Sequence, residues 1–141
     1  MSLVRRTTTT SAALAIAALA LSGPAFSAQA DSGPNWKTLA SITGGKIQAC
    51  KMPVTPTGPW KIKLRVDATK AHGKVTGSAY IMKKGTQTNE SWTSGWVAPG
   101  KISSLGMVKL PVGENYTMDA GIGTTAMGDG GSFTSSNLPH C

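Results

Sequence analysis

Apolar and polar side chains alternate with a period of two along most of the chain after Gly44. The clearest segment spans residues 60–69. One face there carries only apolar side chains and the other only charged or hydroxyl-bearing ones: Trp60, Ile62, Leu64, Val66 and Ala68 against Lys61, Lys63, Arg65, Asp67 and Thr69. Successive side chains of a strand point to opposite faces, so this pattern predicts a half-buried strand of an antiparallel sheet. A slip of one residue would bury the cations, which disfavours any other register.

The same alternation, interrupted by Gly- and Pro-rich turns, predicts about seven strands: residues 45–52, 60–69, 73–83, 91–97, 102–110, 114–122 and 132–138. Lys84-Gly85 and Pro99-Gly100 mark turns, and residues 128–131 are expected to form a loop. Gly77 interrupts the third strand and indicates a bulge or a close backbone approach. Short strands at regular spacing are typical of an all-β domain, either an antiparallel sandwich or a small barrel.

The end regions predict how the chain is divided. Arg5 and Arg6 precede an apolar run, residues 12–21, that is shorter than the roughly 20 residues needed to span a bilayer. The small residues Ala28 and Ala30 then predict signal-peptide cleavage before Asp31, hence a secreted protein. Both Sec and Tat export remain open, because paired arginines occur in both kinds of signal. Residues 1–30 are thus the signal peptide, 31–43 an N-terminal arm or short helix (with 35–42 as the helical candidate), and 44–141 the β domain.

The sequence Leu-Pro-Val-Gly-Glu-Asn-Tyr-Thr-Met-Asp-Ala, residues 110–120, resembles the E–F corner of immunoglobulin-like and fibronectin-III-like domains. In this resemblance Leu110 closes strand E and Tyr116 is the corner tyrosine of strand F. No cysteine follows two residues after Tyr116, so the cross-sheet disulfide of antibody domains is not expected. The resemblance implies a seven-stranded immunoglobulin-like sandwich in which Cys50 and Cys141 would tie the first strand to the last.

Cys50 and Cys141 are the two cysteines of the chain. In an exported protein an even count predicts a disulfide. A redox pair would favour a C-x-x-C spacing, and a metal site would need further ligands. An intermolecular bridge is the remaining alternative. Within the chain-entropy account, a loop this long contributes on the order of 4 kcal/mol of stability.

No catalytic, metal-binding or cofactor-binding residue is predicted. His72 and His140 are the only histidines, and neither lies near a serine in a nucleophile motif. The carboxylates show no paired arrangement of the kind that glycoside hydrolysis needs, and Asp129-Gly130-Gly131 lacks the spaced oxygen ligands of a calcium loop. We therefore expect a protein that is not an enzyme and needs no cofactor.

Basic residues offer one candidate surface. The chain has 14 Lys and Arg against 6 Asp and Glu, and the mature part keeps a net charge of +6 because only Arg5 and Arg6 lie in the signal peptide. Five cations are expected to share one outer sheet face if the two strands bearing them are neighbours: Lys61, Lys63, Arg65, Lys101 and Lys109. Such a face would bind an anionic cell-surface or extracellular polymer. Alternating lysines also keep half-exposed strands soluble and unpaired.

Tryptophans offer a second candidate surface. Trp92 and Trp96 are expected on one face of a strand, where they could stack on sugar rings. The competing interpretation places them in the core, because a small domain needs its large apolar groups. Asn89 and Asn115 match the N-glycosylation pattern, which matters only in some organisms.

The expected function is that of a secreted, non-enzymatic binding module, with an anionic polymer or an extracellular protein as partner and no membrane span in the mature part. The alternative is a small inhibitor of an extracellular hydrolase that presents residues 121–131 as a rigid loop. The sequence leaves the oligomeric state open.

Overall fold

The computed structural model describes residues 35–53 and 55–141, so the predicted signal peptide, residues 1–30, lies outside the described residues. The described residues form eight strands and one short 3-10 helix. In chain order these are β1 (Lys37–Ile42), β2 (Gly45–Pro53), β3 (Trp60–Asp67), β4 (Val75–Lys83), β5 (Thr86–Val97), β6 (Gly106–Leu110), β7 (Tyr116–Gly123), β8 (Gly128–Phe133) and η1 (Ser135–Asn137).

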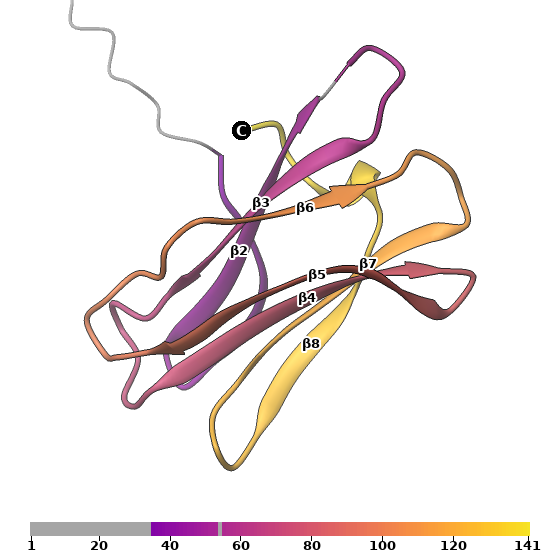
Figure 1. The fold of residues 1–141 in the computed structure, drawn as a ribbon. Coiled ribbons are helices and arrows are strands. Elements are labelled where there is room, and N and C mark those ends of the chain that lie inside the picture. The colour runs from indigo at the N-terminus through magenta and orange to yellow at the C-terminus, as the bar shows by residue number, and fades with distance from the viewer. Residues whose placement is uncertain (1–34, 54) are drawn as a thin grey trace, which may run out of the picture. The chain divides into compact units, whose positions relative to one another are not determined.

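The strands form two antiparallel four-stranded sheets, ordered β1-β2-β3-β6 and β5-β4-β7-β8 (Figure 1). The predicted all-β sandwich is confirmed, and the barrel alternative is wrong because the two sheets do not join into one closed ladder. The strand count differs from the prediction by one, since β1 was not expected. Three tight hairpins, β1–β2, β4–β5 and β7–β8, keep chain neighbours in the same sheet.

The prediction of an arm or short helix at residues 35–42 is wrong, because Lys37–Ile42 is the edge strand β1. Thr43 and Gly44 form the turn into β2 with φ angles of 45° and 83°. Positive φ at both central residues is the signature of the two-residue hairpin turn that matches strand twist. Pairing with β2 therefore decides the conformation of a segment whose own pattern is weakly helical.

Two other predicted boundaries also change. Residues 102–105 are not part of a strand: β6 begins only at Gly106, and Ile102 is 48% exposed. The predicted loop at 128–131 is most of β8, whereas the predicted strand at 132–138 ends at Phe133 and gives way to η1. A glycine-rich strand escapes prediction because it carries no alternation of side chains, although its backbone pairs with β7.

The core lies between the sheets and is built from the predicted inward positions. Ile62, Leu64 and Val66 of β3 are each fully buried. Gly77 of β4 also faces inward, and a Cβ added there would overlap the Val66 side chain and lie 3.3 Å from Ile47 Cδ1. The close backbone approach predicted at Gly77 is confirmed.

The C-terminal segment leaves the second sheet and closes onto the first. Lys51 N–H donates to the Pro139 carbonyl at 2.9 Å, and Cys141 N–H donates to the Lys51 carbonyl at 3.0 Å. These bonds make a parallel β-bridge between Lys51 and His140. Beside it, Cys50 and Cys141 form the predicted disulfide, with Cα atoms 5.0 Å apart. The disulfide therefore ties β2, the second strand rather than the first, to the segment after β8.

Candidate functional site

The outer face of the β1-β2-β3-β6 sheet carries a row of cations. Lys61, Lys63 and Arg65 point outward from β3, since the residues between them are buried. Lys109 of β6 lies directly opposite Lys61 in the antiparallel ladder, so both side chains stand on the same face. These four residues, Lys61, Lys63, Arg65 and Lys109, are called the cationic strip below. The structure thus brings together four of the five predicted cations.

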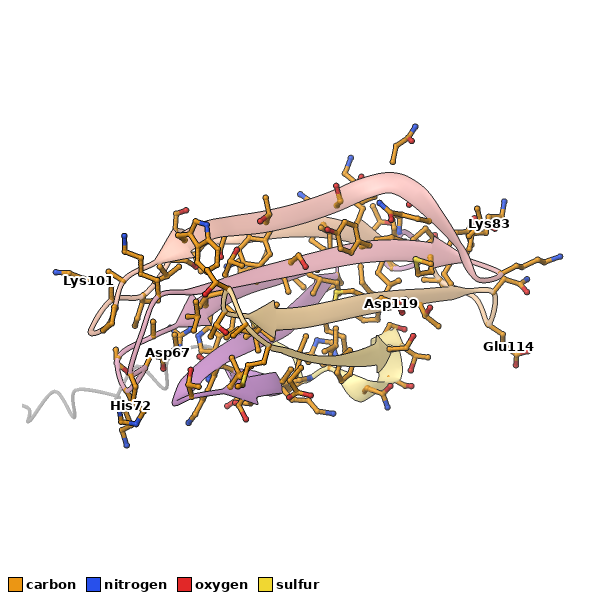
Figure 2. All side chains as sticks on the ribbon, turned by 90° about the horizontal axis from the view of Figure 1, so that it is seen from below. Asp67, His72, Lys83, Lys101, Glu114 and Asp119 are labelled. Carbon is orange, nitrogen blue, oxygen red and sulfur yellow. A yellow bond between two sulfur atoms is a disulfide. The ribbon has the colours of Figure 1, made fainter. Side chains whose placement is uncertain are left out.

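The fifth predicted cation, Lys101, is not part of the strip. It lies in the exposed turn 98–101, where its carbonyl accepts a hydrogen bond from Ala68 N–H at 2.8 Å. Figure 2 shows Lys101 at the same end of the sandwich as Asp67 and His72, with Lys83 and Glu114 at the other end. The prediction failed because it extended the strand back to residue 102, whereas the chain there is irregular.

Arg65 is the most firmly held member of the strip. Its Nε donates to Gln48 Oε1 at 2.9 Å, and its guanidinium lies over the Trp36 ring, 4.3 Å from the ring centroid. Stacking of this kind orients the planar group while leaving its other N–H donors available at the edge. The contribution of Trp36 could not be predicted, because it depends on β1 joining the sheet.

Asp67, the one carboxylate on β3, is bonded within its own turn. Its pKa is lowered from the ordinary value of 3.8, first by the hydrogen bond from the Thr69 hydroxyl and then by that from Thr69 N–H, with distances to Oδ1 of 2.6 and 3.0 Å. The charges of Arg65 and Lys46 lower the pKa further, so Asp67 also interacts with the Arg65 end of the strip.

The lowered pKa of Asp67 yields a pH prediction. A depressed folded-state pKa stabilises the fold above the unfolded pKa, and this contribution is lost as pH falls through the folded value. Thr69→Val removes the hydroxyl donor, so it is expected to raise the pKa of Asp67 and move this loss to higher pH. NMR titration of the Asp67 side-chain carboxyl carbon measures this pKa in both proteins. An Asp67 pKa that is the same in wild type and Thr69→Val would contradict the assignment.

Trp92 and Trp96 lie on opposite faces of β5, so the prediction that they share a face is wrong. Thr76 pairs with Trp96 but Ser78 pairs with Thr93, so β5 contains one extra residue, at a bulge beside Gly95 with a φ of 65°. The bulge reverses the alternation. Trp92 packs inward against the core, whereas Trp96 is 54% exposed on the outer face of the second sheet.

The remaining candidates stay apart. His72 and His140 are both exposed, and His140 contacts the Trp60 ring edge-on at 5.3 Å between centroids. In residues 35–53 and 55–141 no group of three or more His, Cys, Asp or Glu side chains could hold a metal ion. Asn89 and Asn115 are exposed.

Two carboxylates of the second sheet accept hydrogen bonds from the edge strands of the first sheet. Glu90 Oε1 accepts a hydrogen bond from Lys109 N–H at 2.8 Å, and Asp129 Oδ2 accepts one from Ser41 N–H at 3.1 Å. Lys109 lies on β6 and Ser41 on β1, the two edge strands of the first sheet. These carboxylates occupy edge N–H groups that could otherwise pair with another chain.

The segment 121–131, predicted as a presented loop of an inhibitor, is mostly strand. Only residues 124–127 form a turn, closed by a hydrogen bond from Thr124 N–H to the Met127 carbonyl at 2.8 Å. Within residues 121–131 the loop is therefore four residues long.

No helix among the described residues is long and apolar enough to cross a membrane. Comparison of the chain with protein-family models, with curated proteins and with solved structures finds no match. Function therefore has to be inferred from the geometry and charge of the chain itself.

Proposed function

We propose that this protein is an extracellular, non-enzymatic binding module whose cationic strip binds an anionic polymer. The observation that carries the proposal is the direct opposition of Lys61 and Lys109 on one sheet face. Like charges directly opposite each other destabilise a sheet. Solubility alone would be served as well by a lysine facing a glutamate, so a repulsive pair on the open face favours a role in attracting negative charge.

The spacing of the strip suits a repeating anion. Alternate residues on a strand are about 6.7 Å apart, and neighbouring strands are about 4.8 Å apart. Lys61, Lys63 and Arg65 therefore form a line of charges along β3, with Lys109 beside its first member. A flexible polymer with one phosphate, sulfate or carboxylate on each unit can lie along this line, and its affinity falls as salt screens the charges.

We also infer that the sandwich is immunoglobulin-like. Strands β2, β3, β4, β5, β6, β7 and β8 correspond to A, B, C, C′, E, F and G, which makes the sheets A-B-E and C′-C-F-G, with β1 added beside A. Leu110 ends β6 and is 1% exposed, and Tyr116 opens β7. Tyr116 N–H donates to the Gly113 carbonyl at 3.2 Å, as expected for a tight corner between E and F.

The first test is retention on immobilised heparin, used as a general polyanion, with elution by increasing NaCl. The strip variant Lys61→Gln/Lys63→Gln/Lys109→Gln is expected to elute at much lower salt than wild type. The slope of log affinity against log salt concentration should be smaller in magnitude by about two to three, because about that many ionic contacts are lost. The matched control is Lys70→Gln/Lys84→Gln/Lys101→Gln, which removes the same charge from exposed turns and should keep nearly the wild-type slope.

Stability gives the second readout. Because Lys61 and Lys109 repel each other, Lys109→Gln is expected to raise the free energy of unfolding by a few tenths of a kcal/mol while weakening heparin binding. Equal loss of retention in the strip variant and the turn-lysine control would show that net charge alone binds the polymer. That result would contradict the proposal that the cationic strip is the binding site.

A further inference from the structure

The outer face of the second sheet, β5-β4-β7-β8, differs in chemistry from the cationic strip. Three consecutive rows of the ladders on this face comprise twelve residues: Trp96, Thr76, Gly123 and Gly128; Thr93, Ser78, Gly121 and Gly130; Ser91, Tyr80, Asp119 and Ser132. These twelve residues are called the hydroxyl face below. They include five Ser and Thr, four Gly, two aromatic residues, one carboxylate and no Lys or Arg. A polyanion would find no cation among them.

Glycine leaves the middle of the hydroxyl face bare. Two depressions of about 400 and 430 Å³ adjoin there and share Ser78 and Gly121, so they form one shallow trough across β4, β7 and β8. Packing explains Gly130, where an added Cβ would lie 2.8 Å from the Ala120 carbonyl oxygen. Packing does not explain Gly128: the nearest atom would be 3.6 Å away, an ordinary contact, and its φ is not positive. One further reason for a glycine in a strand is the close approach of a ligand to the backbone.

Aromatic rings stand at the sides of the trough. Trp96 is 54% exposed and Tyr80 is 38% exposed. Trp96 pairs with Thr76, four residues before Tyr80 on β4, which corresponds to about 13 Å along the strand. Beyond Trp96 a further depression of about 530 Å³ continues past Lys74 and Thr124. The bulge at Gly95 is what turns this indole toward solvent instead of the core. Rings this far apart suit a chain of several units better than a single small molecule.

Hydrogen-bonding groups lie between the rings. Asp119 Oδ1 accepts a hydrogen bond from the Ser132 hydroxyl at 2.6 Å, and Tyr80 is the cross-strand neighbour of Asp119. Figure 2 shows Asp119 on the sheet, between the two ends of the sandwich. A carboxylate held in this way can accept further hydrogen bonds from ligand hydroxyls, and charge-assisted bonds of this type are the stronger ones. The same carboxylate repels an anionic ligand.

We propose that the hydroxyl face is a second binding site, for an uncharged polysaccharide. Sugar rings present C–H faces to stack on Trp96 and Tyr80, and hydroxyls to bond Asp119 and the serine and threonine side chains. The glycine trough admits the extended chain between them. The two faces of the sandwich would then bind different polymers, one anionic and one neutral.

The test uses isothermal titration calorimetry of the wild-type protein with cellohexaose, chitohexaose, mannohexaose and maltohexaose, each up to millimolar concentration. At least one hexasaccharide is expected to bind, and at least tenfold more tightly than its monosaccharide, since the site spans several units. Trp96→Ala should weaken that binding at least tenfold. Gly128→Val should weaken it similarly by filling the trough, while its thermal midpoint stays at or above that of wild type.

The strip variant Lys61→Gln/Lys63→Gln/Lys109→Gln is the matched control, because it should bind the hexasaccharide as wild type does. Conversely, Trp96→Ala should be retained on heparin as wild type is. The experiments therefore test the glycan site and the polyanion site independently, so that a negative result for one site leaves the other unaffected. Absence of heat with all four hexasaccharides, or binding that neither Trp96→Ala nor Gly128→Val changes, would overturn the glycan site.

Discussion

Removing the Cys50–Cys141 disulfide is expected to lower the free energy of unfolding by about 4 kcal/mol. The two cysteines are separated by 91 residues, so the cross-link restricts nearly the whole unfolded domain. It also holds the C-terminal segment on β2, where Leu138 is 3% exposed and Lys51 Nζ donates to the Ser135 carbonyl at 2.7 Å. Urea unfolding of Cys50→Ala/Cys141→Ala against wild type measures the effect.

Reduced wild type is the control for that variant, because it lacks the S–S bond but retains both cysteine side chains. The two should unfold at similar urea concentrations, with the variant slightly less stable, since Cys50 is fully buried and alanine leaves a small void. A double variant within 1 kcal/mol of oxidised wild type would show that the disulfide does little for the stability of this fold.

Gly106→Ala is expected to destabilise the protein by about 3 kcal/mol, at the upper end of what overpacking costs. A Cβ at this position would overlap the indole ring of Trp92. The ring would have to leave the flank between the sheets, where it packs on the core. The control is Gly73→Ala: nothing lies within 4 Å of its added Cβ, and its φ is not positive. That change should leave stability unchanged or raise it slightly.

A double-mutant cycle isolates the contact between residues 106 and 92. In a Trp92→Ala background the space is empty, so Gly106→Ala should cost less than about 1 kcal/mol, which corresponds to a coupling energy of about 2 kcal/mol. If Gly106→Ala were equally destabilising in both backgrounds, its effect would come from the β6 backbone and not from the indole.

These two sites show where contacts hold the two sheets and the C-terminal segment in place. The disulfide and the C-terminal segment fasten one part of the first sheet, and Trp92 with Gly106 fastens the flank where β5 meets β6. Glu90 bonds Lys109 N–H on the same flank, so the backbone that carries one lysine of the strip is held by a carboxylate from the other sheet. The disulfide lies on the outer face of the first sheet, because Cys50 pairs with the outward-facing Lys63.

Local alternation was enough to predict most strands and the outward position of Lys61, Lys63 and Arg65, because a half-buried strand needs one apolar face. The turn at Lys84-Gly85 was equally predictable, and both residues have positive φ, 49° and 79°. The even count of cysteines, together with the predicted export signal, predicted the disulfide. These features depend on residue type and short spacing, so they are visible without knowledge of the fold.

Only the tertiary structure decided which positions share a surface. Lys109 joins Lys61 because β6 pairs with β3, and Lys101 does not because the chain before β6 is irregular. Trp96 faces solvent because one extra residue at Gly95 reverses the alternation of β5, and the glycine trough forms because a strand without side-chain pattern, β8, pairs with β7. Pairing partners, bulges and strand order depend on hydrogen bonds between residues far apart in the chain. A period of two in the sequence fixes which face of a strand each side chain takes, but not which strand lies beside it.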